Sequence, residues 1–178
     1  MKLKNNRAWW VLVALAVTVS GCGIYSFTGA NISSDIKTIS IDYFYNEAGD
    51  GPPQLSQQFT EQLKDYFQNN TNLAFDNTGN GDLQLTGAIT GFGYAPIAPV
   101  SAGNPNLPDV AGLQRLTITV RVQYNNTRDD SNNFDRTFSF YADYNPTTTT
   151  LTAAEPQLID QIFTQVILDI FNASVANW

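Results

Sequence analysis

Strict alternation of apolar and polar side chains is the strongest pattern in the chain, and it predicts strands. It is clearest over residues 116–124, where every second residue is Leu, Ile, Val or Tyr and the residues between are Thr, Arg or Gln. Residues 134–142 repeat the alternation after a polar turn, so the two segments predict an antiparallel hairpin. Residues 82–94 alternate too, with Gly87 and Gly91 in phase with the apolar positions, which indicates a bulge, a bend or a close backbone approach.

One more strand is expected near the start of the chain. Residues 36–43 are rich in β-branched side chains, and Ile39, Ile41 and Tyr43 would share one face of the strand. Residues 73–75 are a candidate for a further, very short strand.

A period close to four predicts two helices. Over residues 54–68 the residues Leu and Phe recur every four positions on an otherwise polar cylinder, and Pro53 fits a first helical turn. A second helix runs to the end of the chain with a wide apolar face. Thr152 and Glu155 have the spacing of a capping box, and Pro156 is compatible with the first turn of that helix.

The resulting order is strand, helix, strand, strand, strand, helix (β-α-β-β-β-α). These elements bury their apolar sides best in an α+β two-layer sandwich, with two helices packed on one face of a four-stranded mixed sheet. The other sheet face carries Thr, Gln and Arg and can meet water. Residues 95–112 contain four prolines, so this stretch is expected to be a long loop that is either disordered or used in contact with a partner.

The first residues predict export and lipid attachment. A positive start is followed by an uncharged apolar run that is too short to span a bilayer, and then by the small residues that precede Cys22. We therefore expect a lipoprotein signal peptide over residues 1–21, fatty acid (palmitate) on Cys22, a lipidated tether over residues 22–34 and a single domain over residues 35–178. The alternative is an ordinary signal peptide with an incidental cysteine.

Removal of the signal peptide would leave six Lys and Arg against sixteen Asp and Glu, a net charge of about −10. So acidic a body argues against nucleic acid as a partner. An anionic ligand would need a local basic patch, and Arg115 and Arg121 share one face of their strand, with Arg136 expected close by on the neighbouring strand. This patch is a candidate site for a phosphorylated glycolipid, and the alternative is cross-strand pairing of these arginines with acids such as Asp135.

The sequence offers little for catalysis. It contains no histidine, and its one cysteine is the predicted lipid attachment site, so we expect no enzyme activity, no metal and no cofactor beyond the covalent lipid. Asp129 and Asp130 form an adjacent carboxylate pair in a turn, where Asp usually shapes the backbone. A periplasmic hydrolase that uses this pair stays open as a less favoured alternative. Asp76 and Asp82 lack the spacing of a calcium-binding loop.

Several segments, taken together, resemble the LptE family of lipopolysaccharide-assembly lipoproteins, in the form found in the Bacteroidetes lineage. They are the predicted lipobox followed by Gly-Ile-Tyr-Ser-Phe-Thr-Gly, the strand over residues 36–41, Gly-Asp-Leu leading to Gly-Ala-Ile-Thr, Leu-Thr-Ile-Thr-Val, and the ending from residue 169 to residue 178.

The resemblance implies two helices on a four-stranded sheet, no catalysis, and a lipid-anchored position on the periplasmic face of the outer membrane. It also implies that the protein plugs the β-barrel LptD and assists lipopolysaccharide transport and assembly, with lipopolysaccharide as a further ligand. The alternative function is that of a free-standing periplasmic lipid carrier or structural lipoprotein.

Overall fold

The computed structural model describes residues 32–97 and 112–175. The predicted signal peptide, Cys22, most of the predicted tether and the greater part of the predicted proline-rich loop lie outside the described residues.

In these two ranges the sheet has six strands. They are β1 (Thr38–Ile41), β2 (Tyr45–Asn46), β3 (Ala74–Phe75), β4 (Leu83–Pro96), β5 (Gln114–Asn126) and β6 (Phe134–Tyr144). The strand order is β3-β1-β4-β5-β6, and β2 pairs with β4 beyond the end of β1. The pairs that involve β1 and β2 are parallel, whereas β4, β5 and β6 form an antiparallel meander. The mixed sheet and the hairpin are therefore confirmed. The candidate strand at residues 73–75 is confirmed as β3. The predicted count of four strands and the order β-α-β-β-β-α are wrong, because β3 belongs to the sheet and β2, a two-residue strand too short to leave a periodic pattern, precedes α2.

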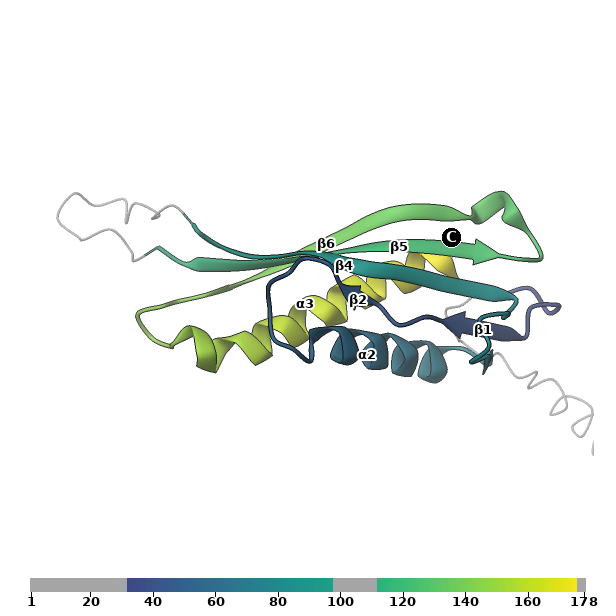
Figure 1. The fold of residues 1–178 in the computed structure, drawn as a ribbon, viewed down its shortest axis with the longest axis horizontal. Helices are drawn as coiled ribbons and strands as arrows, with labels where there is room; N and C mark the ends of the chain where they lie inside the picture. Colours follow the sequence, from purple (N-terminus) through teal and green to yellow (C-terminus); the bar gives the residue numbers. More distant parts are fainter. Residues whose placement is uncertain (1–31, 98–111, 176–178) are drawn as a thin grey trace, which may run out of the picture.

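Two helices cover one face of this sheet, as predicted (Figure 1). They are α2 (Leu55–Asn70) and α3 (Leu151–Ser174), and a short 3-10 helix, η2 (Asp130–Asn132), lies in the turn before β6. Edge-to-face ring contacts connect the layers: the Phe44 and Phe59 ring centroids are 5.2 Å apart, and those of Phe59 and Phe163 are 5.0 Å apart. All three rings are fully buried, so they form the centre of a continuous apolar core.

The segment between β1 and β2 differs from the expectation that Tyr43 would face the core. The regular strand ends at Ile41, and the backbone changes phase before β2 begins. As a result Phe44 is fully buried, while Tyr43 is exposed and packs against Tyr45. The main-chain N–H of Phe44 donates to the Thr60 hydroxyl on α2, which fixes this change of phase.

Strand β4 also changes phase, at a bulge. Ile89 pairs with Val120 and Gly91 pairs with Thr119, so Thr90 is an extra residue on β4. Inward-facing positions are therefore odd-numbered before the bulge and even-numbered after it, where Phe92 is buried. The predicted bulge is confirmed, but Gly91 lies out of phase with Gly87 rather than in phase with it.

The start of α3 does not contain the predicted capping box. The helix begins at Leu151, its N-cap residue is Thr150, and no side chain caps it. Pro156 lies inside the helix rather than in its first turn. The N–H groups of a helix's first turn have no partner within the helix, so a proline there loses no hydrogen bond. Pro156 lies about one turn further on, close enough to the start of the helix to be tolerated.

Glycine is required at position 87 because β4, β5 and the ring of Phe44 approach one another closely. A Cβ atom at Gly87 would lie 2.1 Å from the Arg121 carbonyl oxygen and 2.6 Å from the Phe44 ring, whereas a Cβ atom at Gly93 would have no neighbour within 4 Å. We expect Gly87→Ala to lower the free energy of unfolding by about 1–3 kcal/mol and Gly93→Ala to change it by less than about 1 kcal/mol. Urea denaturation of both variants measures this difference, and equal stabilities would contradict the close approach.

Candidate binding surface

The helices leave one face of the sheet uncovered, and we call it the open face. Its side chains are those that alternate with the buried residues of the meander. On β5 and β6 these residues are Arg115, Thr117, Thr119, Arg121, Gln123, Asn125, Asp135, Thr137, Ser139, Tyr141 and Asp143. The strong alternation of β5 in the sequence thus produces one apolar and one polar sheet surface.

Hydrogen bonds between neighbouring strands hold these polar side chains in place. The hydroxyl oxygens of Thr119 and Ser139 are 3.0 Å apart, and the Asn125 amide donates to the Gln84 side-chain oxygen at 3.1 Å. The Asn133 amide in turn donates to Asn125 at 2.8 Å. Side chains fixed in this way lose little further freedom on binding, so the open face is organised in advance for contact.

Both arginines predicted on this face are held by acids on β6. Arg115 donates to the two carboxylate oxygens of Asp143 at 2.8 and 3.0 Å, and its guanidinium carbon lies 3.5 Å from the centre of the Tyr141 ring. Arg121 forms the equivalent bidentate pair with Asp135. The hydrogen bond from Arg121 lowers the pKa of Asp135, and the bond to Asp135 raises the pKa of Arg121. Each pair is electrically neutral overall, and each guanidinium keeps further N–H groups for another acceptor.

Arg136 does not join the other two arginines. It lies opposite Val122 in the antiparallel register, and residues directly opposite one another point to the same side of the sheet. Since Val122 is fully buried, Arg136 lies on the helix side, where its guanidinium carbon is 5.2 Å from the centre of the Phe134 ring. The expectation that Arg136 would lie close to Arg115 and Arg121 is wrong. It considered only that the two strands are neighbours, whereas the register between them decides to which side of the sheet Arg136 points.

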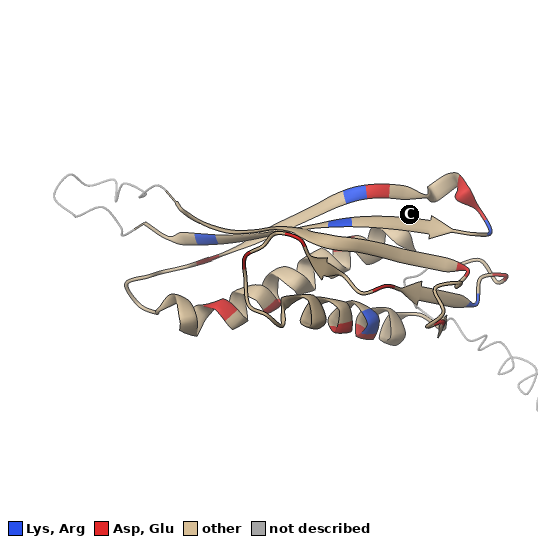
Figure 2. Ribbon diagram, viewed as in Figure 1, with Lys and Arg blue, Asp and Glu red and all other residues tan. Residues whose placement is uncertain are grey.

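The two layers differ in charge. On β5 and β6, basic and acidic residues lie beside one another, whereas the helices carry mostly acidic residues (Figure 2). Helix α3 carries Glu155, Asp160 and Asp169 and no basic residue. The net negative charge of the chain is therefore concentrated away from the open face, and an anion is repelled less by the open face than by the helices.

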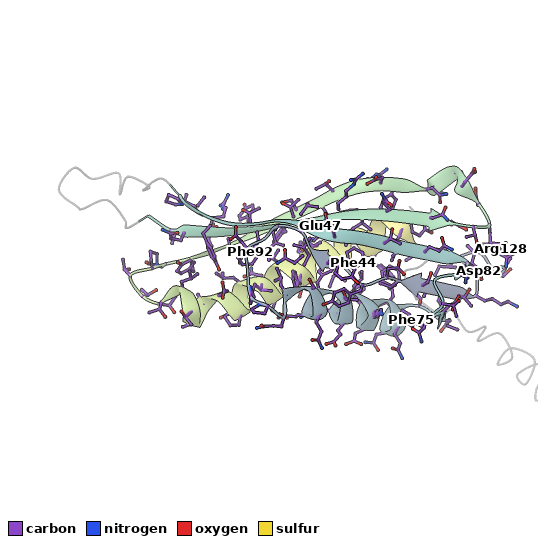
Figure 3. All side chains as sticks on the ribbon, viewed as in Figure 1. Phe44, Glu47, Phe75, Asp82, Phe92 and Arg128 are labelled. Atoms are coloured by element: carbon purple, nitrogen blue, oxygen red, sulfur yellow. The ribbon has the colours of Figure 1, made fainter. Side chains whose placement is uncertain are left out.

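Asp82 joins three parts of the fold at one end of the sheet (Figure 3). Its Oδ2 accepts hydrogen bonds from the main chain of Lys37 at 2.9 Å and of Thr38 at 3.1 Å, and also from the Thr38 hydroxyl. Its Oδ1 lies 2.7 Å from the Arg128 guanidinium, and its carbonyl oxygen accepts from the N–H of Thr127. The hydrogen bond from Lys37, followed by that from Arg128, holds the pKa of Asp82 well below its ordinary value.

No pattern in the sequence indicates this role of Asp82. Its partners are more than 40 residues away along the chain. The pairing of β4 with β1 brings Lys37 and Thr38 to it, and the pairing of β4 with β5 brings Arg128. A carboxylate directly before a strand is compatible with many local turns, so sequence spacing alone does not distinguish this arrangement.

Asp129 and Asp130, the carboxylate pair of the alternative hydrolase function, lie in the exposed turn after β5. The Asp129 side chain accepts from the N–H of Ser131 at the start of η2, and this bond lowers the pKa of Asp129. A general acid needs a raised pKa, so this environment favours the turn-shaping role.

Among the described residues no group of three or more His, Cys, Asp or Glu is arranged to hold a metal ion. None of the helices in the described ranges is long and apolar enough to cross a bilayer.

The fold is thus a two-layer α+β domain with one open polar sheet face, a class that presents a broad surface for contact. The chain belongs to the LptE family, which is described as lipopolysaccharide-assembly and whose model matches residues 36–174. This family is one of outer-membrane lipoproteins that take part in lipopolysaccharide assembly.

A comparison with solved structures finds similar chains in three bacteria. The hypothetical protein CT253 from Chlamydia trachomatis has a TM-score of 0.51 at 8% identity, covering 80% of this chain and 99% of its own. A minor lipoprotein from Acinetobacter baumannii has a TM-score of 0.46 at 18% identity, covering 76% of this chain and 90% of its own. Lipoprotein B from Nitrosomonas europaea has a TM-score of 0.45 at 9% identity, covering 84% of this chain and 87% of its own. A comparison with curated protein sequences finds no match.

The role of Asp82 is testable through the pH dependence of stability. A carboxylate whose folded-state pKa is lowered stabilises the fold fully above its unfolded-state pKa and loses this contribution as pH falls toward the folded value. We expect Asp82→Asn to melt at a lower temperature than the wild type at pH 7, and the difference to shrink below about pH 4.

Thermal unfolding followed by circular dichroism between pH 7 and pH 2.5 measures this difference. Asp160→Asn is the matched control, because Asp160 lies exposed on α3 and accepts a bond from the Gln62 amide rather than from a cation. A difference between the wild type and Asp82→Asn that stays constant down to pH 2.5 would contradict the role assigned to the Asp82 charge.

Proposed function

We infer that this protein is a non-catalytic outer-membrane lipoprotein that plugs an LptD-type β-barrel and assists the transport and assembly of lipopolysaccharide. The observation that carries this proposal is the open face: a continuous, hydrogen-bonded and ion-paired polar surface in a chain of the LptE family.

The chemistry of the open face suits the interior of an outer-membrane barrel. Lumen-facing side chains of such barrels are polar, in contrast to the apolar band that faces lipid. A partner surface of this kind gains hydrogen bonds from Thr, Ser, Gln and Asn side chains. It does not have to desolvate an isolated charge, because Arg115 and Arg121 are already neutralised. The apolar face of the sheet is occupied by the helices and is not available for contact.

The proposed lipid anchor agrees with the position of the first described residues. Ile32 and Ser33 line a cavity together with Arg128 and Asp129. The first described residues therefore lie beside Arg128, the ion-pair partner of Asp82. Fatty acid on Cys22, ten residues earlier, would hold this end toward the membrane. The opposite end of β4 and β5 then points away from the attachment site (Figure 1).

Isolation of the full-length lipoprotein from its own cells tests the barrel partnership. After gentle detergent extraction and crosslinking, we expect it to co-purify with an outer-membrane β-barrel. Recovery of the lipoprotein alone would contradict the plug function and favour a free-standing carrier.

A bulky side chain on the open face should weaken this complex. Thr137 is exposed on the open face, and we expect Thr137→Trp to lower the yield of the complex at least about tenfold, which corresponds to roughly 1.4 kcal/mol. Gln57→Trp on the exposed side of α2 is the matched control and should leave the yield unchanged. Equal yields from both variants would remove the open face from the proposal.

Lipopolysaccharide contact at Arg115 and Arg121 is part of the same proposal, and it has its own test. The double variant Arg115→Ala/Arg121→Ala should bind lipopolysaccharide more weakly than the wild type, with a larger loss at about 50 mM than at about 300 mM salt. The double variant Asp135→Asn/Asp143→Asn frees both guanidiniums and should bind more tightly. Binding that is the same for all three proteins in a fluorescence titration would exclude these arginines.

A further inference from the structure

Strand β6 leaves one side of its backbone without a partner. Within residues 32–97 and 112–175 it is the last strand in the sheet order and pairs with β5 alone. Every second residue of an antiparallel edge strand directs both its N–H and its C=O outward, so about five of the 11 residues of β6 offer unpaired main-chain groups. The opposite edge differs, because it is divided among the short strands β1, β2 and β3.

Most features that protect an edge strand are missing from β6. The strand contains no proline and no lysine, and its register with β5 is continuous from Tyr144 to Phe134 without a bulge. The strand does carry three charged residues: Asp135 and Asp143 are paired with arginines of β5, and Arg136 lies on the helix-facing side against the Phe134 ring. Arg136 protects the first part of the edge, so the stretch from Thr137 to Tyr144 is left open.

A groove lies at the end of this open stretch, where Asp143 and Tyr144 contribute to its lining. It has a volume of about 370 Å³ and lies between the end of β6 and α3. It is lined by Asp143, Tyr144, Ala153, Gln157, Leu158 and Gln161, among others, and no residue of β5 contributes to it. The groove therefore lies on the free side of β6, where the helix-facing side chains of an added strand would lie.

We propose that the edge of β6 and this groove bind an extended segment of a second, different polypeptide, which adds to the sheet as a further strand. The segment is neutral to basic, and it has apolar residues at alternate positions. Its main chain pairs with β6, and one large apolar side chain enters the groove, where Leu158 and Ala154 form the floor and the Gln157 and Gln161 amides lie at the rim.

Charge decides this choice of occupant. The charge of Asp143 is already paired with Arg115, and no Lys or Arg lines the groove. Helix α3, which forms one wall, carries acidic residues and no basic one, so an acidic segment finds no partner for its charge there. A second copy of this chain fits poorly too. Two copies carry the same net negative charge, so they repel one another as their edges approach.

The test uses photocrosslinking in the cells that make the full-length lipoprotein. A photoreactive phenylalanine analogue replaces Ser139 or Tyr141 one at a time, and mass spectrometry identifies the crosslinked residue of the partner. Strand addition predicts that each step of two residues along β6 moves the crosslink by two residues within a single segment of the partner. Thr86, two strands away on β4, is the control position and should not crosslink to that segment.

Filling the groove provides the second measurement. Ala153→Trp should lower the crosslinking yield from Ser139 about tenfold, because the anchoring side chain loses its site, whereas Ala153→Ser should leave it unchanged. Ala153 is exposed, so its replacement leaves the core intact. If Ala153→Trp lowers the melting temperature, Gln157→Trp on the same side of α3 takes its place.

Three results would overturn the proposal: crosslinks to a second copy of this chain, crosslinks scattered over the partner without the two-residue step, and no crosslink at all. The inference does not depend on the barrel partnership. Crosslinks to a barrel from Thr86 and Ser139 alike, without stepping, would support contact through the open face while excluding strand addition.

Discussion

The sheet of this protein is buried on one side only, and the rest of its structure follows from that constraint. Helices α2 and α3 supply the apolar cover, and the fully buried side chains of β5 all point toward them. Folding therefore depends on the helix-facing half of each strand. The residues of the open face are released from packing, so their chemistry can serve contact with another molecule without disturbing the core.

At one end of the sheet, the parallel pair of β1 and β4 meets the antiparallel pair of β4 and β5, and an interaction between these segments stabilises that end. In the described ranges no disulfide fulfils this role, since the one cysteine of the chain is Cys22. Asp82 provides it with hydrogen bonds to β1 and an ion pair to the turn after β5. A single carboxylate thus connects segments that meet only in the folded state, which is why its charge is coupled to stability.

The sequence predicted the parts of the fold whose patterns are long and regular. Helix α2 and the β5–β6 hairpin follow from periods that continue over many residues. The errors occur where the phase of a pattern changes: Phe44 replaces Tyr43 in the core, and the bulge at Thr90 moves the inward positions of β4. A change of phase depends on which strand lies alongside, and this information is not local.

The same reason explains what the sequence revealed about the binding surface. The polar side of β5 could be predicted from the sequence. For its arginines the sequence indicated two alternatives, a free basic patch or cross-strand ion pairs. The pairing itself, and the separation of Arg136 from Arg115 and Arg121, required the register between β5 and β6. The position of Asp82 required the pairing of β1 with β4 in addition.

The distribution of charge relates the open face to the edge of β6. Acidic residues on the outer side of the helices repel anionic surfaces, whereas ion pairs on β5 and β6 cancel one another. A partner that approaches an acidic protein meets the least repulsion at the sheet, where hydrogen-bonding side chains are already in place. Strand β6 belongs to both surfaces, since its side chains contribute to the open face and its main chain forms the free edge. Contact at one surface therefore brings a partner within reach of the other, and occupation of both orients the partner along the direction of the strands.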